Sequence, residues 1–142
     1  MSGINDFAGM RELMQDFIQE SAELLATVDG KLLGLERSPN DVSLRNDLFR
    51  VFHSIKGGAG FLNADELVSL CQLAENLFDP LGHTKPRLDA ETMKALSAVT
   101  GEIRHMLHAL RQGVQPPPAP AELVASLQAA LEDSLPRRMR DS

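Results

Sequence analysis

Residues 44–61 read LRNDLFRVFHSIKGGAGF, a stretch in which a helical apolar pattern runs into a polar and glycine-rich segment. The apolar residues recur every three or four positions, as on the buried face of a helix. They are Leu44, Leu48, Val51, Phe52 and Ile55. At about 100° per residue, the mean direction of this stripe places His53 on roughly the opposite side of the helix. The stretch therefore predicts an amphipathic helix that exposes an imidazole.

The residues after His53 combine one positive charge with a lack of side chains. Lys56 follows His53 by one helical turn, so the two side chains share a face. Gly57, Gly58 and Gly60 come next, and each makes continuation of a helix costly by about 1 kcal/mol relative to alanine. Three glycines in four residues exceed what a helix C-terminus needs. We predict that the helix ends near Lys56 and that Gly57 and Gly58 leave room for a docking protein.

The rest of the chain carries further apolar stripes at helical spacing. The expected helices span residues 5–37, 41–56, 63–81, 89–113 and 120–135. Asn40 is the expected N-cap of the second helix, and Asn63 with Glu66 forms the expected capping box of the third. Gly30 and Gly34 weaken the last turns of the first helix.

Composition and connection lengths give the fold class. Aromatic residues make up only 4% of the chain, Trp and Tyr are absent, and no segment alternates with period two, so helices rather than sheets are expected. The 142 residues suffice for one domain. Short connections predict an all-α, up-down antiparallel four-helix bundle over 1–113. A Pro-rich connector over 114–120 leads to a short additional C-terminal helix over 121–135, which either docks on the bundle or belongs to a linker. Residues 136–142 are expected to form a flexible tail or the start of an interdomain linker.

Charge, hydropathy and cysteine content exclude several classes of protein. The net charge is −6 and no helix carries a basic stripe, which argues against nucleic acid as a partner. No apolar run reaches the ~18 residues of a membrane span, and no signal pattern precedes the first helix, so a cytoplasmic location follows by default. Cys71 is alone and on an apolar face, as for a buried thiol. His105 and His108 lack a third ligand, so no metal site is expected. No large apolar stripe is left over, which predicts a monomer.

The third expected helix carries a polar strip beside its apolar face. Gln72 and Glu75 are three residues apart and lie off that face. If the glycine-rich turn pairs the two helices, this strip comes opposite His53. A carboxylate near one imidazole nitrogen fixes the tautomer and leaves the other nitrogen as a nucleophile, while Lys56 lies where a phosphoryl group would bring negative charge. Phe49, one turn before His53, either docks a partner or packs against the edge of the third helix.

At these residues the sequence resembles a known family. His53-x-x-Lys56-Gly57 resembles the phosphorylation motif of histidine phosphotransfer (HPt) domains. The string over 53–60 is closest to the N-terminal phosphoacceptor domain of CheA-type chemotaxis histidine kinases, and Ala-Glu-Asn-Leu-Phe-Asp over 74–79 is similar to that family's second segment.

The resemblance implies a role for each site residue. His53 would accept the phosphoryl group on Nε2, Glu75 would hold Nδ1–H, and Lys56 would stabilise the phosphate. Gly57 would admit the partner. Gln72 is a departure, because such kinases often carry a second histidine there. Glutamine still forms hydrogen bonds but does not titrate, which bears on the rate and pH dependence of phosphorylation rather than on the acceptor.

The implied function is phosphotransfer. His53 would receive a phosphoryl group from ATP, bound with Mg²⁺ by the ATP-binding domain of a histidine kinase, and pass it to an aspartate of a response regulator receiver domain. The chain itself holds no cofactor and is not an enzyme in isolation. It is either part of a CheA-type kinase or a free-standing shuttle. The alternative is a helical scaffold that binds a partner without carrying phosphate.

Overall fold

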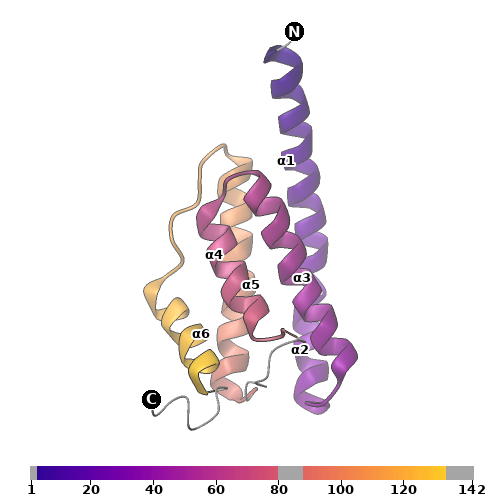
Figure 1. Cartoon of the computed structure of the whole chain (residues 1–142), viewed down its shortest axis with the longest axis vertical. Helices are drawn as coiled ribbons and strands as arrows, with labels where there is room; N and C mark the ends of the chain where they lie inside the picture. The colour runs from indigo at the N-terminus through magenta and orange to yellow at the C-terminus, as the bar shows by residue number, and fades with distance from the viewer. Residues whose placement is uncertain (1–2, 80–87, 134–142) are drawn as a thin grey trace.

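The computed structural model describes residues 3–79 and 88–133, and this part of the chain contains helices and no strand. The helices are α1 (Gly3–Leu25), α2 (Val28–Arg37), α3 (Val42–Phe61), α4 (Asp65–Asn76), α5 (Ala90–Arg111) and α6 (Ala121–Asp133). Figure 1 shows α1 and α2 running in one direction, α3 returning, and α4, α5 and α6 continuing the alternation. The predicted all-α bundle with a short C-terminal helix is confirmed.

The core is made of aliphatic side chains contributed by all six helices. The apolar stripe that predicted α3 is buried from Leu48 onward, with Phe52 fully enclosed and stacked on Phe78 at a centroid distance of 6.2 Å. The pair formed by α3 and α4 has the most extensive contact in the bundle. Burial of each large aliphatic or aromatic side chain contributes about 1.5–3 kcal/mol, so this pair holds its relative position firmly.

The expected single helix over 5–37 is divided in two. The helical hydrogen bonds are interrupted at residues 26–27, where the Thr27 hydroxyl donates to the Leu24 carbonyl at 2.7 Å. Such local bonding by threonine competes with the helical pattern and bends it. Gly34 lies well inside α2 and serves packing, because a Cβ there would lie 2.8 Å from a methyl carbon of Leu44 on α3.

The expected end of α3 at Lys56 is wrong, because the helix continues through the glycines to Phe61. Ile55 and Ala59 are both fully buried on the continuing face. Tertiary packing of an amphipathic face outweighs the propensity cost of glycine, which is why the local signal failed. The helix that carries His53 and Lys56 is therefore longer than expected by more than one turn.

The turn between α3 and α4 differs from the expected capping box. Asn63 takes the left-handed conformation with φ 57°, its N–H donates to the Gly60 carbonyl, and the Ala64 N–H donates to the Ala59 carbonyl. This is a Schellman motif, so Asn63 ends α3 instead of beginning α4, and α4 starts without a side-chain cap. The N-cap of α3 is also displaced by one residue, from Asn40 to Asp41, whose carboxylate accepts from the Leu44 N–H at 3.1 Å.

The C-terminal half of the chain follows the expected pattern with shorter helices. α4 ends at Asn76 rather than near Leu81, which lies outside the described residues with the rest of 80–87. α5 ends at the expected glycine, since Gly113 has φ 77°. α6 docks on α4 and α5 and buries Leu127 and Ala130, which settles its placement in favour of the bundle. Figure 1 shows the connector returning from the end of α5 to the start of α6.

None of the described helices combines the length and the apolar character that a bilayer crossing requires.

Candidate functional site

The site is centred on His53, which α3 presents to solvent. Its side chain is 60% exposed, although Phe52 beside it in the sequence is fully buried. The position opposite the apolar stripe therefore predicted the exposure of His53 correctly. The imidazole Nδ1 lies 3.1 Å from Glu75 Oε2 on α4.

Glu75 is the buried anchor of the site, with only 6% of its side chain exposed. Its Oε2 accepts from His53, and its Oε1 accepts a short hydrogen bond from Lys56 Nζ. A buried carboxylate is tolerated only when it is paired and hydrogen-bonded, and here both oxygens are occupied. The proximity of Gln72 and Glu75 to His53 and Lys56, predicted from spacing alone, is present in the structure.

The hydrogen bond to Glu75 selects one tautomer of the His53 imidazole. An ionised carboxylate only accepts, so Nδ1 of His53 carries the proton and donates it. The lone pair of the neutral ring is then on Nε2. This arrangement makes Nε2 the unprotonated nitrogen of a ring whose side chain is largely exposed.

Lys56 of α3 and Gln72 of α4 extend the site between the two helices. Lys56 Nζ donates to Gln72 Oε1 at 3.0 Å, and Gln72 Nε2 donates to Asn76 Oδ1 at 2.7 Å. The amide of Gln72 is thereby oriented with its oxygen toward the ammonium group. Asn76 was missed by the sequence reasoning, although its position four residues after Gln72 places the two side chains on one face of the helix.

Phe49 contacts the imidazole directly. Its ring stacks on that of His53 with centroids 5.5 Å apart and planes 13° from parallel. Phe49 is half-buried against the core and its ring covers one face of His53, while a role in docking a partner stays a prediction. The imidazole is thus restrained at Nδ1 by Glu75 and on one face by Phe49.

The glycines of the site have separate environments. A Cβ built on Gly57 meets nothing within 4 Å, so this position is open, as expected for a surface that admits a partner. A Cβ on Gly58 would lie 2.3 Å from the Phe17 ring of α1. Gly58 is half-exposed, and the side on which a Cβ would lie faces Phe17, so its part in a docking surface stays a prediction.

Two further groups of interest lie outside the site. Burial raises the pKa of the Cys71 thiol to about 12, with Glu75 raising it further and Lys56 lowering it, so Cys71 is a neutral core residue. His105 and His108 are both exposed on α5. Within 3–79 and 88–133, no three potential metal ligands are gathered closely enough to hold an ion.

Comparison with known sequences identifies relatives of this arrangement. The profile of the Hpt domain matches residues 12–113. The chain is 30% identical to the chemotaxis protein CheA of Rhizobium meliloti over 134 residues, which cover 94% of this chain and 18% of that protein. It is 39% identical to the sensor histidine kinase CheAY of Helicobacter pylori over 70 residues, which cover 49% of this chain and 9% of that protein. The chain thus spans less than a fifth of the length of these relatives.

The fold also has a solved counterpart. It is similar to the crystal structure of the phosphorylated P1 domain of CheA3 in complex with CheY6 from R. sphaeroides, with a TM-score of 0.76 and 20% sequence identity. The superposition covers 88% of this chain and 99% of that chain. This similarity extends over the whole counterpart domain and supports the helical arrangement described above.

Proposed function

This chain belongs to the Hpt domain family, and on that premise we propose that it is a phosphotransfer module whose phosphoacceptor is His53. The observation that carries the proposal is the hydrogen bond of 3.1 Å between His53 Nδ1 and Glu75 Oε2, which leaves Nε2 of an exposed ring as the nucleophile. In this role the module is a substrate of a kinase and not an enzyme by itself.

The first transfer forms a nitrogen–phosphorus bond. The Nε2 lone pair of His53 attacks the γ-phosphorus of ATP, and the bond to the bridging oxygen breaks so that ADP leaves with those electrons. The proton on Nδ1 stays in its hydrogen bond to Glu75, whose negative charge offsets the positive charge that develops on the ring. Lys56 supplies a cation within reach of the transferred phosphoryl oxygens.

The second transfer reverses this bond change. A carboxylate oxygen of a receiver aspartate attacks the phosphorus, the bond to Nε2 breaks, and the ring returns to its neutral form with Nδ1–H still bound to Glu75. Phe49 and Glu75 keep the imidazole in one orientation through both steps, so little ordering of the ring is needed at either transition state. Gly57 leaves the approach to Nε2 free of bulk.

The relatives support the choice of partners. They are a chemotaxis protein CheA and a sensor histidine kinase, which favours a histidine kinase ATP-binding domain, with ATP and Mg²⁺ bound there, as the donor. The structural counterpart is phosphorylated and in complex with CheY6, which favours a second protein as the recipient. The parent is then a CheA-type kinase or a shuttle that serves one. A cytoplasmic location and a monomeric state of the module remain predictions.

The test is phosphorylation in trans. The chain is mixed with a CheA-type kinase core and γ-labelled ATP, with His53→Gln as the variant and His105→Gln, an exposed histidine on α5, as the matched control. We expect acid-labile, alkali-stable label on the wild type and on the His105 variant only. Label retained by His53→Gln would overturn the assignment, and an unlabelled wild type beside an active kinase core would favour the scaffold.

A further inference from the structure

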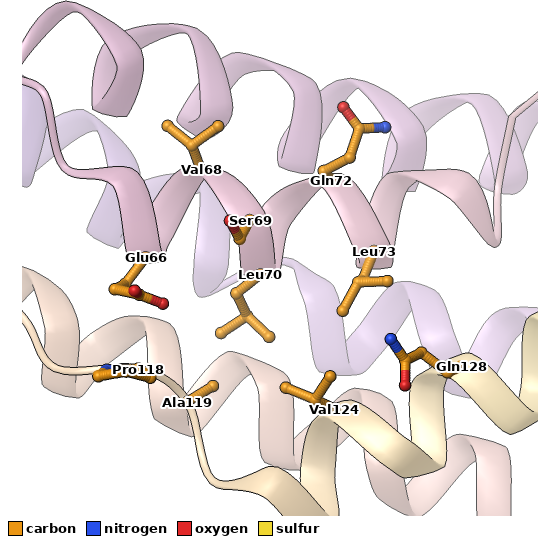
Figure 2. Close-up of a pocket in the computed structure, with 10 residues that line it drawn as sticks. All are labelled: Glu66, Val68, Ser69, Leu70, Gln72, Leu73, Pro118, Ala119, Val124 and Gln128. Carbon is orange, nitrogen blue, oxygen red and sulfur yellow. The ribbon is translucent and has the colours of Figure 1, made fainter.

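A groove lies beside the site, between α4 and the segment formed by the connector and α6. Its volume is about 490 Å³. Figure 2 shows Leu70 and Leu73 pointing from α4 toward Val124 of α6, with Pro118 and Ala119 of the connector closing one end. Most of the side chains that face each other across this groove are apolar, with Glu66 and Gln128 also in the lining, so it can take up an apolar side chain from another molecule.

The two helices that form the groove, α4 and α6, carry charge of one sign. No Lys or Arg occurs at residues 57–84 or 112–136, the two stretches that contain α4, the connector and α6. Glu66 lines the groove, and Asp65, Glu122 and Glu132 are exposed on the same two helices. Among the described residues, neither Glu66 nor Glu122 forms an ion pair with a cation. The lining of the groove is therefore largely apolar, with Glu66 in it and further carboxylates on the same two helices; these acidic residues are called the anionic rim.

The groove and the site share a residue. Gln72 belongs to the groove lining, and its amide accepts the hydrogen bond from Lys56 Nζ. Figure 2 shows the Gln72 side chain directed away from α6. A protein that occupies the groove therefore contacts the α4 side of the site, next to the residues that hold His53.

Two proteins must reach His53 in the proposed function, and their charges differ. A domain that holds the triphosphate of ATP does so with lysine, arginine and Mg²⁺, so its nucleotide-binding mouth is cationic. A receiver offers a carboxylate as the acceptor, so its reacting face is acidic. An anionic rim attracts the first and repels the second, because complementary potentials favour encounter and like charges oppose it.

We propose that this groove docks the ATP-binding kinase domain, by taking an apolar side chain that is flanked by lysine or arginine on the donor's surface. The inference rests on the proposed function and adds a docking site for the phosphoryl donor. Donor docking on α4 and α6 brings the donor next to Gln72 and Lys56, on the α4 side of His53. The open surface at Gly57 remains for the approach of the recipient.

The test compares two double variants that change the net charge equally. Glu66→Lys/Val124→Arg fills the groove and reverses its rim, whereas Glu36→Lys/Leu33→Arg alters exposed positions on α2. With a CheA-type kinase core and Mg·ATP, we expect the groove variant to raise the KM for the chain about tenfold with kcat little changed. The α2 variant should match the wild type. Added salt should narrow the difference, because the rim charges are exposed.

A second readout separates docking from damage to the site. Both variants, once phosphorylated, should pass the label to a receiver domain at the wild-type rate, and thermal unfolding followed by circular dichroism should show that both are folded. The milder Glu66→Gln should raise the KM in the same direction by about threefold if the double variant folds poorly.

The outcomes distinguish the two proposals. A wild type that takes phosphate and a groove variant with unchanged KM would overturn the docking site alone. Slower transfer to the receiver, with the donor KM unchanged, would assign the groove to the recipient and also overturn the inference. A wild type that takes no phosphate would remove the proposed function and this inference with it.

Discussion

At the scale of single residues, the site is built around one buried carboxylate. Glu75 holds His53 with one oxygen and Lys56 with the other. Phe49 stacks on the same imidazole, so an exposed ring is kept in one orientation by contacts on an edge and a face. Gln72 contributes a neutral acceptor to Lys56. The contacts that orient His53 therefore come from a carboxylate and an aromatic ring.

This arrangement predicts the effect of Glu75→Gln. The amide removes the negative charge opposite the developing imidazolium and no longer requires Nδ1 to carry the proton. Loss of a hydrogen-bonded carboxylate behind a reactive histidine should slow phosphorylation about tenfold to a hundredfold. The rate of labelling in trans measures the loss, and imidazole nitrogen chemical shifts should show a mixture of tautomers. Gln72→Ala, which removes the neutral contacts to Lys56 and Asn76 but no charge, is the control and should slow labelling less. An unchanged rate in Glu75→Gln would mean that the carboxylate is structural.

At the scale of elements, the close approach of α1 to α3 decides the course of α3. Phe17 of α1 lies on the backbone of α3 at Gly58, where a side chain would collide with its ring. Ala59 beside it is fully buried, so this turn belongs to the packed part of the helix. The Schellman motif with Asn63 in the left-handed conformation then reverses the chain into α4 within a few residues. Together these features align α3 and α4 so that His53 meets Glu75.

Two neighbouring glycines should therefore respond oppositely to alanine. Gly58→Ala forces a methyl group into the Phe17 ring and should destabilise the chain by about 1–3 kcal/mol. Gly57→Ala meets nothing within 4 Å and should stabilise it by about 0.5–1 kcal/mol through helix propensity. Urea unfolding of each variant measures the free energies.

A second pair of variants, made in the Phe17→Ala background, tests whether the Phe17 ring causes the loss of stability in Gly58→Ala. If the collision with the ring is responsible, Gly58→Ala should cost much less in that background, and the difference gives the coupling between the two positions. Equal costs in both backgrounds would show that the ring is not what excludes a side chain at Gly58.

At the scale of the whole molecule, α4 contributes residues both to the core and to the polar site. This helix buries Leu67, Leu70, Cys71 and Ala74, and the next residue, Glu75, is the buried carboxylate of the site. α6 and the connector cover the outer side of this helix. The Cys71 thiol, held neutral with a pKa raised to about 12, lies between the core and Glu75.

The raised pKa of Cys71 predicts a loss of stability in alkali. In the unfolded chain the thiol ionises near pH 8.5, whereas in the folded chain it keeps its proton to about pH 12. Between these values the folded state binds more protons, so the free energy of unfolding falls as pH rises, by at most about 1.4 kcal/mol per pH unit. Below pH 8.5 this contribution is fully present. Urea unfolding at about pH 8 and about pH 10 measures the fall.

Cys71→Ala is the control for this titration. It should be less stable at neutral pH because of the cavity it leaves, but it should show a smaller fall between the two pH values. Equal falls in wild type and variant would show that the Cys71 thiol is not the source of the alkaline loss.

The sequence by itself determined the helical class and the approximate positions of the helices, the exposure of His53 and the pairing of its strip with that of Glu75. All of these follow from periodicity within one helix or between helices joined by a short turn, and such local patterns are written in the chain. The tertiary structure decided the rest. It made Gly58 a contact with Phe17, carried α3 past its glycines, stacked Phe49 on His53, and docked α6 to form the groove beside α4. These features depend on how closely residues distant in the sequence approach one another, and packing of that kind outweighs the modest local propensities that a sequence reveals.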